Sequence, residues 1–377
     1  MTLADELSSL PAPILQRLAE RGFKKERLLG LAADLGKGKE ARNRLSGVVA
    51  PPRPGDVLEL PAHGSKEHEA FRKFGVDALR RGEVALCVLA GGMATRMGGV
   101  VKALVEALPG KTFLDLRLDE QAAHERDLGA HVPLWLMTSE ATYRPIVEAL
   151  GSRADGERVA VFEQCVSMRL TPDGSLFREA DGDPSIYATG HGDLPEALHK
   201  SGLLTRFLER TKGHGTVWIA NLDNLGATVD AGLLGLHLGH GGPLSVEVVD
   251  KVGSDKGGVP VVWNDRRIIA EEFRLPRDLD PATIRVFNTN TFLADAKRLH
   301  DLDFDFTFVE VEKNVDGKKA VQFERLLGEV SVPLEPRFVR VPREGTASRF
   351  LPVKDNPELE ARRPEILAVA KARGFAP

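Results

Sequence analysis

The chain of 377 residues carries 51 lysines and arginines against 55 aspartates and glutamates, which gives a formal net charge of −4. Its hydrophobic content of 42% and charged content of 28% are ordinary for a globular protein, and they give no reason to expect nucleic acid or an anionic membrane as a partner. The two cysteines, Cys87 and Cys165, lie in apolar runs, which excludes a disulfide framework or a cysteine metal site. No run approaches the ~20 apolar residues of a membrane span, and the first residues lack a signal-peptide pattern. We therefore expect a cytoplasmic protein.

Residues 1–80 are predicted to form a helical segment that packs on the rest of the chain. The apolar residues of 14–23 are spaced for one helix face, and a Pro-rich stretch at 50–55 reads as a linker or crossing loop. Residues 68–81 then place Phe71, Phe74 and Leu79 on one face, which is typical of an amphipathic helix. We see no residue pattern for chemistry in this segment.

From residue 84 onward, strand-like and helix-like runs alternate. This alternation, with nearly continuous apolar strands, predicts an α/β three-layer domain with a mostly parallel central sheet over 81–335. A C-terminal extension, 336–377, would end in a helix. The predicted strands are Val84–Ala90, Val132–Thr138, Val159–Gln164, Thr216–Leu222, Leu244–Val249, Val259–Trp263 and Arg285–Asn288. The predicted helices are Asp115–Leu128, Ala141–Leu150, Leu194–Ser201, Leu203–Arg210, Ala231–His237 and Asp295–Leu302.

A Gly-rich, basic loop follows the first of these strands. The run Val84–Ala90 ends at Gly91 and Gly92, and Arg96, two more glycines and Lys102 come after them. Glycines let a backbone turn its N–H groups toward phosphate, and Arg and Lys neutralise the oxyanions. An ordinary glycine turn is the alternative, since the loop matches neither common nucleotide-binding glycine motif.

Polar side chains stand where several predicted strands end. Gln164, Asn221, Asp223, Asn288 and Asn290 all follow apolar runs. In α/β sheets, ligands bind beyond the carboxyl ends of the strands, so these residues are candidates for a site. The alternative is that Asn and Asp simply cap strands and turns.

Two further stretches carry charged or titratable residues. His191 stands between two glycines in Gly190–Asp193, where it could donate to a phosphate, and Asp193 is expected to be a helix N-cap. Near the C-terminus, Arg349 and Lys354 flank an apolar run, and the residues alone favour a solvated charge pair.

These motifs together resemble a known family. The blocks are Lys111–Leu116, Val132–Thr138, Gly190–Asp193, Ser201–Leu204, Asn221–Asp230, Lys256–Gly258, Phe287–Asn290 and Arg349–Lys354, and they follow one another in the family's order. From about Val84 to Lys354 the chain resembles the UTP–glucose-1-phosphate uridylyltransferases (UDP-glucose pyrophosphorylases) of the eukaryotic-type UDP-sugar pyrophosphorylase family. The resemblance implies a Rossmann-like α/β/α nucleotidyltransferase domain that makes UDP-glucose and pyrophosphate from UTP and glucose 1-phosphate.

The resemblance also implies roles for single residues. Uracil and ribose would be held by the backbone of Leu89, Ala90, Gly91 and Gly92, together with Gln164 and Gly190. The phosphates would be bound by Arg96, Lys102 and Lys354, with His191 beside the transferred phosphoryl group. Mg²⁺ would be held by Asp223. The glucosyl hydroxyls would contact Asn221, Gly258, Glu271 and Asn288.

The chemistry needs no general base. The phosphate of glucose 1-phosphate is already ionised at neutral pH, so the site has to neutralise charge and align the groups in line. One carboxylate suffices for Mg²⁺ when substrate phosphates complete its coordination.

Some residues depart from the family pattern. Ala90, Ala94, Arg96 and Val101 differ from residues common in glucose-type members, and Arg96 is closer to the hexosamine-type ones. A UDP-N-acetylhexosamine or broad UDP-sugar pyrophosphorylase therefore stays open, as does a non-catalytic sugar-nucleotide-binding protein. The β-helix domain that carries oligomer contacts in many relatives has no counterpart after Lys354, so we expect a monomer.

Overall fold

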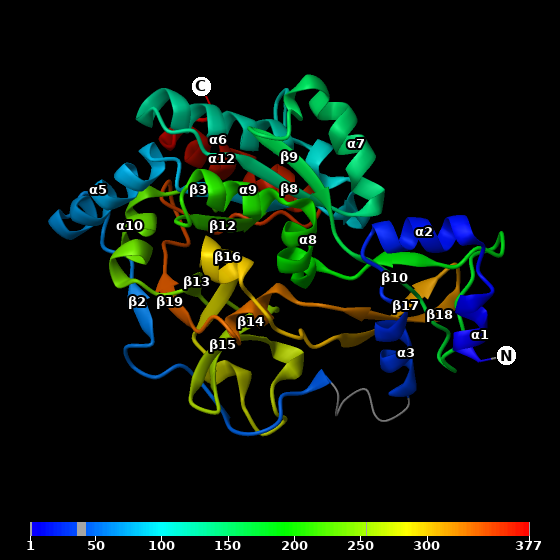
Figure 1. Ribbon diagram of the computed structural model, residues 1–377. Coiled ribbons are helices and arrows are strands. Elements are labelled where there is room, and N and C mark those ends of the chain that lie inside the picture. Colours follow the sequence, from blue (N-terminus) through cyan, green and yellow to red (C-terminus); the bar gives the residue numbers. More distant parts are fainter. Residues whose placement is uncertain (1, 36–42, 254, 377) are drawn as a thin grey trace.

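The computed structural model describes residues 2–35, 43–253 and 255–376 (Figure 1). Its centre is an eight-stranded sheet in which only β16 is antiparallel to its neighbours. This arrangement confirms the predicted α/β class with a mostly parallel central sheet. In spatial order the strands are β2 (Val57–Glu59), β19 (Pro336–Arg340), β13 (Leu244–Asp250), β16 (Val286–Asp295), β12 (Thr216–Asn221), β3 (Val84–Leu89), β8 (Leu134–Thr138) and β9 (Val159–Glu163).

Apolar side chains of the central sheet alternate between two cores, one on each face. In β3, Val84, Leu86 and Val88 belong to one core, whereas Ala85 and Cys87 belong to the other. The first core is covered by α5 (Lys66–Arg80), α6 (Phe113–Leu128), α7 (Glu140–Leu150), α10 (Ala231–His240) and α12 (Asn356–Ala372). The second is covered by α8 (Leu194–Ser201), α9 (Leu203–Arg210) and α11 (Ala296–His300). The three predicted layers are therefore present.

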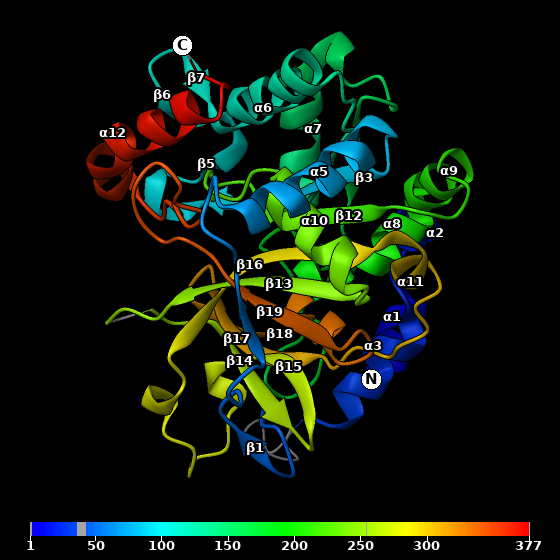
Figure 2. The same ribbon diagram turned by 90° about the vertical axis from the view of Figure 1, so that its left-hand side faces the viewer.

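A second, smaller layer of strands lies beside the central sheet (Figures 1 and 2). One small sheet joins β1 (Val49–Ala50), β14 (Gly258–Trp263) and β15 (Arg266–Glu271). Two hairpin-like pairs are β10 (Val166–Met168) with β11 (Ile186–Ala188), and β17 (Val309–Val315) with β18 (Lys318–Glu324). They share an apolar core with α1 (Leu3–Ser8), α2 (Ala12–Glu20) and α3 (Lys25–Ala33). The N-terminal helices thus pack on these strands.

Short elements complete the chain. Two small β-pairs after β3 are β4 (Met93–Ala94) with β5 (Val100–Val101), and β6 (Glu106–Leu108) with β7 (Lys111–Thr112). The 3-10 turns are η1 (Thr95–Met97), η2 (Lys102–Leu104), η3 (Gly151–Arg153), η4 (His191–Asp193), η5 (Glu272–Arg274), η6 (Pro281–Thr283) and η7 (Leu327–Ser331). Among the described residues, no helix is both long and apolar enough to cross a bilayer.

Several expectations need correction. The predicted strand Val259–Trp263 is β14, which lies in the small sheet instead of the central one. The predicted strand Arg285–Asn288 is the start of β16, which runs on to Asp295 and is antiparallel to its neighbours. The helix expected over Asp295–Leu302 is the shorter α11. The central sheet also includes β2 and β19, which lie outside the range 81–335 that we expected for the α/β domain. The division at residues 80 and 335 stays a prediction, and residues 1, 36–42 and 377 of the flanking segments lie outside the described residues.

Two glycines allow α5 and α10 to pack in close contact (Figure 2). A Cβ on Gly235 of α10 would lie 1.8 Å from the Phe71 carbonyl oxygen of α5. A Cβ on Gly75 of α5 would lie 1.9 Å from the carbonyl oxygen of Ala231. Backbone atoms cannot move aside as a flexible side chain can, so the two helices could not keep this distance with larger residues.

We expect Gly235→Ala to lower the free energy of unfolding by ~2 kcal/mol or more, because overpacking forces the two helices apart. Gly30→Ala in α3, where the added methyl would meet open space, is the matched control and should raise it by up to ~1 kcal/mol. Urea denaturation of both variants checks this. Equal effects of the two substitutions would contradict the packing account.

Candidate active site

The Gly-rich loop is fixed to the ends of the neighbouring strands. The Ala90 N–H donates to the Met137 carbonyl over 2.7 Å, and the Ser139 hydroxyl donates to the Gly91 carbonyl over 3.0 Å. A Cβ on Gly91 would lie 2.9 Å from the Gln164 side-chain nitrogen. The loop after β3 therefore lies against Gln164, and the absent side chain of Gly91 leaves room for the Gln164 amide.

The backbone of the loop explains why Ala94 is tolerated. Positive φ angles occur at Gly98 (+90°) and Gly99 (+75°), whereas Ala94 has a φ of −75°. A Cβ carries a penalty only in the left-handed region, so alanine adds no strain here. Arg96 is exposed on η1, and within the described residues it makes no hydrogen bond or ion pair.

An ion pair joins the loop to the end of β12. The Lys102 ammonium donates to Asp223 Oδ2 over 2.5 Å, and each side chain is 18% exposed. These residues are 121 positions apart in the sequence. The structure therefore brings together the predicted phosphate-binding lysine and the predicted metal ligand.

Three asparagines connect β12 with β16. The Asn290 side-chain amide donates to Asn221 Oδ1 over 2.8 Å, and its backbone N–H donates to Asn288 Oδ1 over 2.9 Å. Asn290 has a φ of +59°, a conformation that Asn adopts more readily than most residues. We expected Asn288 to end a strand, but it lies in the first half of β16. Because β16 is antiparallel to β12, it is Asn290 that contacts Asn221, and Asn288 is joined to this pair through the Asn290 N–H.

A second group of predicted residues meets where β14 and β15 pair. Gly258 and Glu271 are cross-strand partners. A Cβ on Gly258 would lie 3.0 Å from the Asn288 side-chain nitrogen and 3.3 Å from Glu271 Oε1. Gly258, Glu271 and Asn288 thus lie close together.

The carboxyl of Glu271 has a raised pKa. Burial raises its pKa to about 7, the charge of Glu272 adds to the shift, and Arg274 opposes it. Within the described residues, its side chain forms no hydrogen bond or ion pair. Glu271 can therefore offer both oxygens to a polar ligand.

His191 is held as a neutral hydrogen-bond donor. The Leu327 N–H donates to His191 Nδ1 over 2.8 Å, so in the neutral ring the proton is carried by Nε2. Burial lowers the pKa of His191, with Glu324 opposing the shift. At neutral pH the ring can thus donate one hydrogen bond through Nε2.

The glycines beside His191 serve the protein's own packing. A Cβ on Gly190 would lie 2.6 Å from the Arg325 carbonyl oxygen, and one on Gly192 would lie 2.6 Å from the Leu326 nitrogen. These two glycines therefore allow the chain's own Arg325 segment to approach the turn closely. Asp193 occupies the N-cap position of α8 but makes no side-chain capping bond; instead it accepts from Thr189 over 2.6 Å and from Arg325.

Buried arginines, which the sequence analysis missed, support the segment from Asn221 to Asp230. The Arg117 guanidinium donates to the carbonyl oxygens of Asn221 (2.9 Å) and Asn224 (2.7 Å), and it pairs with Glu120 over 2.8 Å. The spacing of Arg117 and Glu120 on α6 was the only signal for this pair.

Arg349 is also buried, contrary to the expected solvated charge pair. It pairs with Glu247 of β13 over 2.6 and 2.7 Å, and its carbonyl accepts from the Asn224 side chain over 3.1 Å. Asn224 accepts in turn from the Leu351 N–H over 2.7 Å. The segment after Arg349 is therefore tied to the one that carries Asp223.

Lys354 follows that segment and is exposed. Leu351 and Val353 are buried, whereas Lys354 is exposed. Its backbone N–H donates to Glu358 over 2.7 Å, and among the described residues its ammonium makes no ion pair. The structure thus joins Lys102 with Asp223 in an ion pair. The side chains of Lys354 and Arg96 are exposed to solvent.

The described residues contain no group of three or more His, Cys, Asp or Glu side chains arranged to hold a metal. Asp223 offers a single carboxylate. This fits a Mg²⁺ ion that substrate phosphates help to coordinate, and it does not fit a structural zinc site.

Comparison with known proteins identifies relatives. The family described as UTP–glucose-1-phosphate uridylyltransferase matches residues 60–371. The UTP–glucose-1-phosphate uridylyltransferase of Encephalitozoon cuniculi is 30% identical over 310 residues, which cover 78% of this chain and 59% of the relative. That of Astragalus penduliflorus is 29% identical over 382 residues, covering 95% of this chain and 77% of the relative.

A solved structure shows the same fold. The UDP-glucose phosphorylase of Trypanosoma brucei superposes with a TM-score of 0.74 at 24% identity, over 93% of this chain and 77% of that one.

Glu271 generates a prediction about stability. Because its folded-state pKa of about 7 exceeds the usual 4.5, the folded state keeps a proton that the unfolded state has lost between these values. The free energy of unfolding should therefore fall as the pH rises through this window. Glu271→Gln cannot titrate, so it should be more stable than the parent at pH 8, with a smaller difference at pH 5.

Denaturant titrations at both pH values measure this effect. Glu148→Gln, which removes one carboxylate at an exposed position of α7, is the control to which the Glu271→Gln profile is compared. A Glu271→Gln variant with the parent's pH profile would show that the carboxyl is ordinarily solvated.

Proposed function

Because the chain belongs to the UTP–glucose-1-phosphate uridylyltransferase family, we propose that it makes UDP-glucose and pyrophosphate from UTP and glucose 1-phosphate. The matched region spans 59% of the length of the Encephalitozoon relative. The observation that carries the proposal is the Lys102–Asp223 ion pair beside the Gly-rich loop. It supports the proposal because it brings a cation next to the carboxylate that we assign to the metal ion.

The nucleotide half of the substrate would lie along the loop after β3. The backbone of Leu89, Ala90, Gly91 and Gly92, with Gln164 and Gly190, would hold uracil and ribose. The contact between Gly91 and Gln164 supports this assignment, because it brings these two groups together.

The phosphates carry the charge that the site has to neutralise. Arg96, Lys102 and Lys354 would contact the oxyanions, and His191 would donate from Nε2 to the transferred phosphoryl group. Asp223 would hold one Mg²⁺, which would supply further positive charge. The sugar phosphate is already ionised at neutral pH, so no side chain needs to remove a proton from it.

The sugar half would lie between β12, β16 and the β14–β15 hairpin. Glucosyl hydroxyls would bond to Asn221, Asn288 and Glu271, with Gly258 leaving room for the ring. The contacts that gather Gly258, Glu271 and Asn288 support this placement. The unpartnered carboxyl of Glu271 would accept from sugar hydroxyls.

We also propose that the protein is a cytoplasmic monomer. The buried free thiols of Cys87 and Cys165 are compatible with a reducing compartment. Light scattering should give a molar mass near 41.0 kDa, and a multiple of this mass would overturn the monomer.

The activity is tested by pyrophosphate release from UTP and Mg²⁺, with glucose, N-acetylglucosamine and galactose 1-phosphates in parallel. Release with glucose 1-phosphate supports the proposal. Release mainly with another sugar phosphate would move the substrate to the UDP-N-acetylhexosamine or broad-specificity alternative. Silence with all three, from folded protein that binds UTP, would favour a non-catalytic sugar-nucleotide-binding protein.

Asp223→Asn should lower kcat by ~100-fold or more, because it removes a charge that acts on the reacting phosphates. The fold should survive, since Asp223 is partly exposed and Asn keeps its shape. Asp265→Asn makes the same chemical change in the exposed β14–β15 turn and should leave kcat at the parent value. Steady-state kinetics with a circular dichroism check measures both. A near-normal rate for Asp223→Asn would remove this residue from the mechanism.

A further inference from the structure

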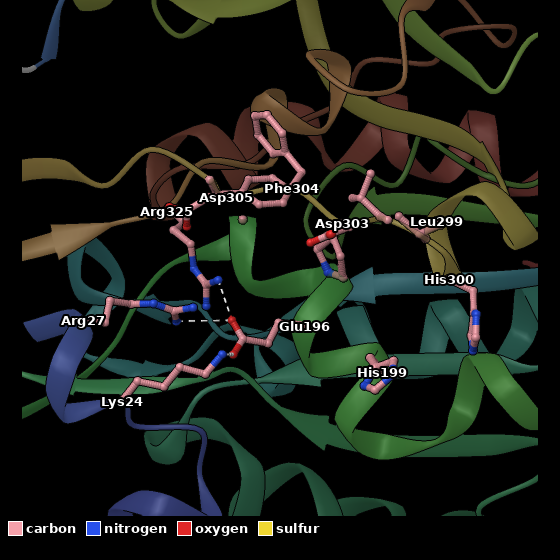
Figure 3. A pocket seen from close by; sticks show the side chains of 14 residues that line it. Lys24, Arg27, Glu196, His199, Leu299, His300, Asp303, Phe304, Asp305 and Arg325 are labelled. Carbon is pink, nitrogen blue, oxygen red and sulfur yellow. Dashed lines mark hydrogen bonds and ion pairs between the residues drawn. The ribbon is translucent and has the colours of Figure 1, made fainter.

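A cluster of ion pairs lies behind the turn that carries His191. Arg325 follows β18, and its side chain is 4% exposed. Its Nε donates to Asp193 Oδ1 and its Nη1 to Glu196 Oε2, each over 2.6 Å. Figure 3 shows Lys24 and Arg27, at the start of α3, reaching the same Glu196 carboxylate beside a cavity of about 410 Å³. The function proposed above uses none of these charges.

These cations keep the carboxyl of Glu196 ionised. Burial by itself would raise the pKa of its carboxyl, but the bonds from Lys24 and Arg325 outweigh burial and hold it at about 2. Glu196 is therefore ionised throughout the neutral range. Arg325 thus has a constant charge partner on α8.

The backbone of Arg325 is seated in the His191 turn. The Gly192 N–H donates to the Arg325 carbonyl over 3.0 Å, and the Arg325 N–H donates to the Thr189 carbonyl over 2.7 Å. The absent side chains of Gly190 and Gly192 leave the space for this contact. The turn and the Arg325 segment are therefore fixed to one another by backbone bonds.

Two residues after Arg325, the chain contacts the imidazole. The Leu327 N–H lies 2.8 Å from His191 Nδ1. A backbone N–H can only donate, so Nδ1 must be unprotonated, and the proton of the neutral ring must be on Nε2. A shift of the backbone at Leu327 would remove the bond that selects this tautomer.

We propose that Arg325 is a positioning residue for His191: through its bonds to Asp193 and Glu196 it holds the segment 325–327 so that His191 presents Nε2–H. The planar guanidinium suits this task, because its fork bonds two carboxylates in fixed directions, whereas a lysine ammonium offers no such geometry. The assignment of a substrate phosphate as the acceptor of Nε2–H rests on the proposed function. The tautomer itself is set by the bond between Leu327 and His191, and does not depend on the proposed function.

Arg325→Lys tests the proposal while it keeps the buried charge. In protein with ¹⁵N-labelled histidine, the His191 resonances, assigned with His191→Gln, should show the Nε2–H tautomer in the parent. In Arg325→Lys we expect a mixture of tautomers and a pKa of His191 closer to its ordinary 6.5. We also expect kcat to fall by ~10-fold, with the KM for UTP changing less.

A matched control separates an effect on the position of His191 from the general loss of an ion pair with Glu196. Arg27→Met removes an outer cation from Glu196 without touching Arg325, and should leave the His191 resonances and kcat unchanged. If Arg325→Lys does not fold, Glu196→Gln weakens the same arm with a neutral side chain and should shift the His191 signals in the same direction. Unchanged His191 tautomer and kcat in a folded Arg325→Lys protein would overturn the proposal, and so would an equal change in Arg27→Met.

The outcome is independent of the proposed reaction. A change of the His191 tautomer in Arg325→Lys supports the positioning role, whether or not the parent protein releases pyrophosphate. If the parent releases no pyrophosphate with any sugar phosphate, that result counts against the proposed function and not against the positioning role. A tautomer change with an unaltered kcat in an active enzyme would overturn the catalytic part of the role.

Discussion

The position of Asp223 depends on buried arginines that hold its chain segment from beneath. Arg117 bonds the carbonyl oxygens of Asn221 and Asn224, and Arg349 bonds the Thr228 carbonyl over 2.7 Å. A buried guanidinium is stable only with its charge matched, and Glu120 and Glu247 provide the match. Burial would raise the pKa of Glu120, but Arg117 and His124 outweigh it and hold it at about 2. Loss of either acid would leave an uncompensated charge under the site, so the network fixes the segment as a whole.

In the central sheet, β16 is the strand that runs antiparallel to its neighbours, and it gives the site its second half. If β16 were parallel to its neighbours, Asn288 would lie at the opposite edge of the sheet from Asn221. Its reversed direction instead brings Asn288 and Asn290 to the carboxyl ends of β12 and β3, and the β14–β15 hairpin then adds Gly258 and Glu271. A charged region around Lys102 and Asp223 thus adjoins a region of amides and one unpartnered carboxyl. This division matches a ligand with phosphates at one end and hydroxyls at the other.

The sequence predicted those parts of the fold that local pattern determines. Continuous apolar runs located β3, β8, β9, β12 and β13, because parallel strands are buried on both faces. The direction of β16 could not be predicted, since apolar content carries no information about strand direction. Family motifs suggested Lys102 and Asp223 as site residues, and the structure joins these two side chains in an ion pair. The burial of Arg349 was missed because its partner, Glu247, lies 102 positions away, and the packing role of Gly190 and Gly192 was missed because the contact is with the distant Arg325 segment.

We propose that a nucleotide's phosphates and its metal ion bind at the Lys102–Asp223 pair. A crystal structure of the protein with UTP and Mg²⁺ tests this most directly. We expect the ion pair to open, with Asp223 on the metal ion and Lys102 on a UTP phosphate, while Arg117 and Arg349 keep their bonds to the 221–230 segment. UTP bound away from the loop after β3, or bound there with the Lys102–Asp223 pair intact and no phosphate on Lys102, would contradict it.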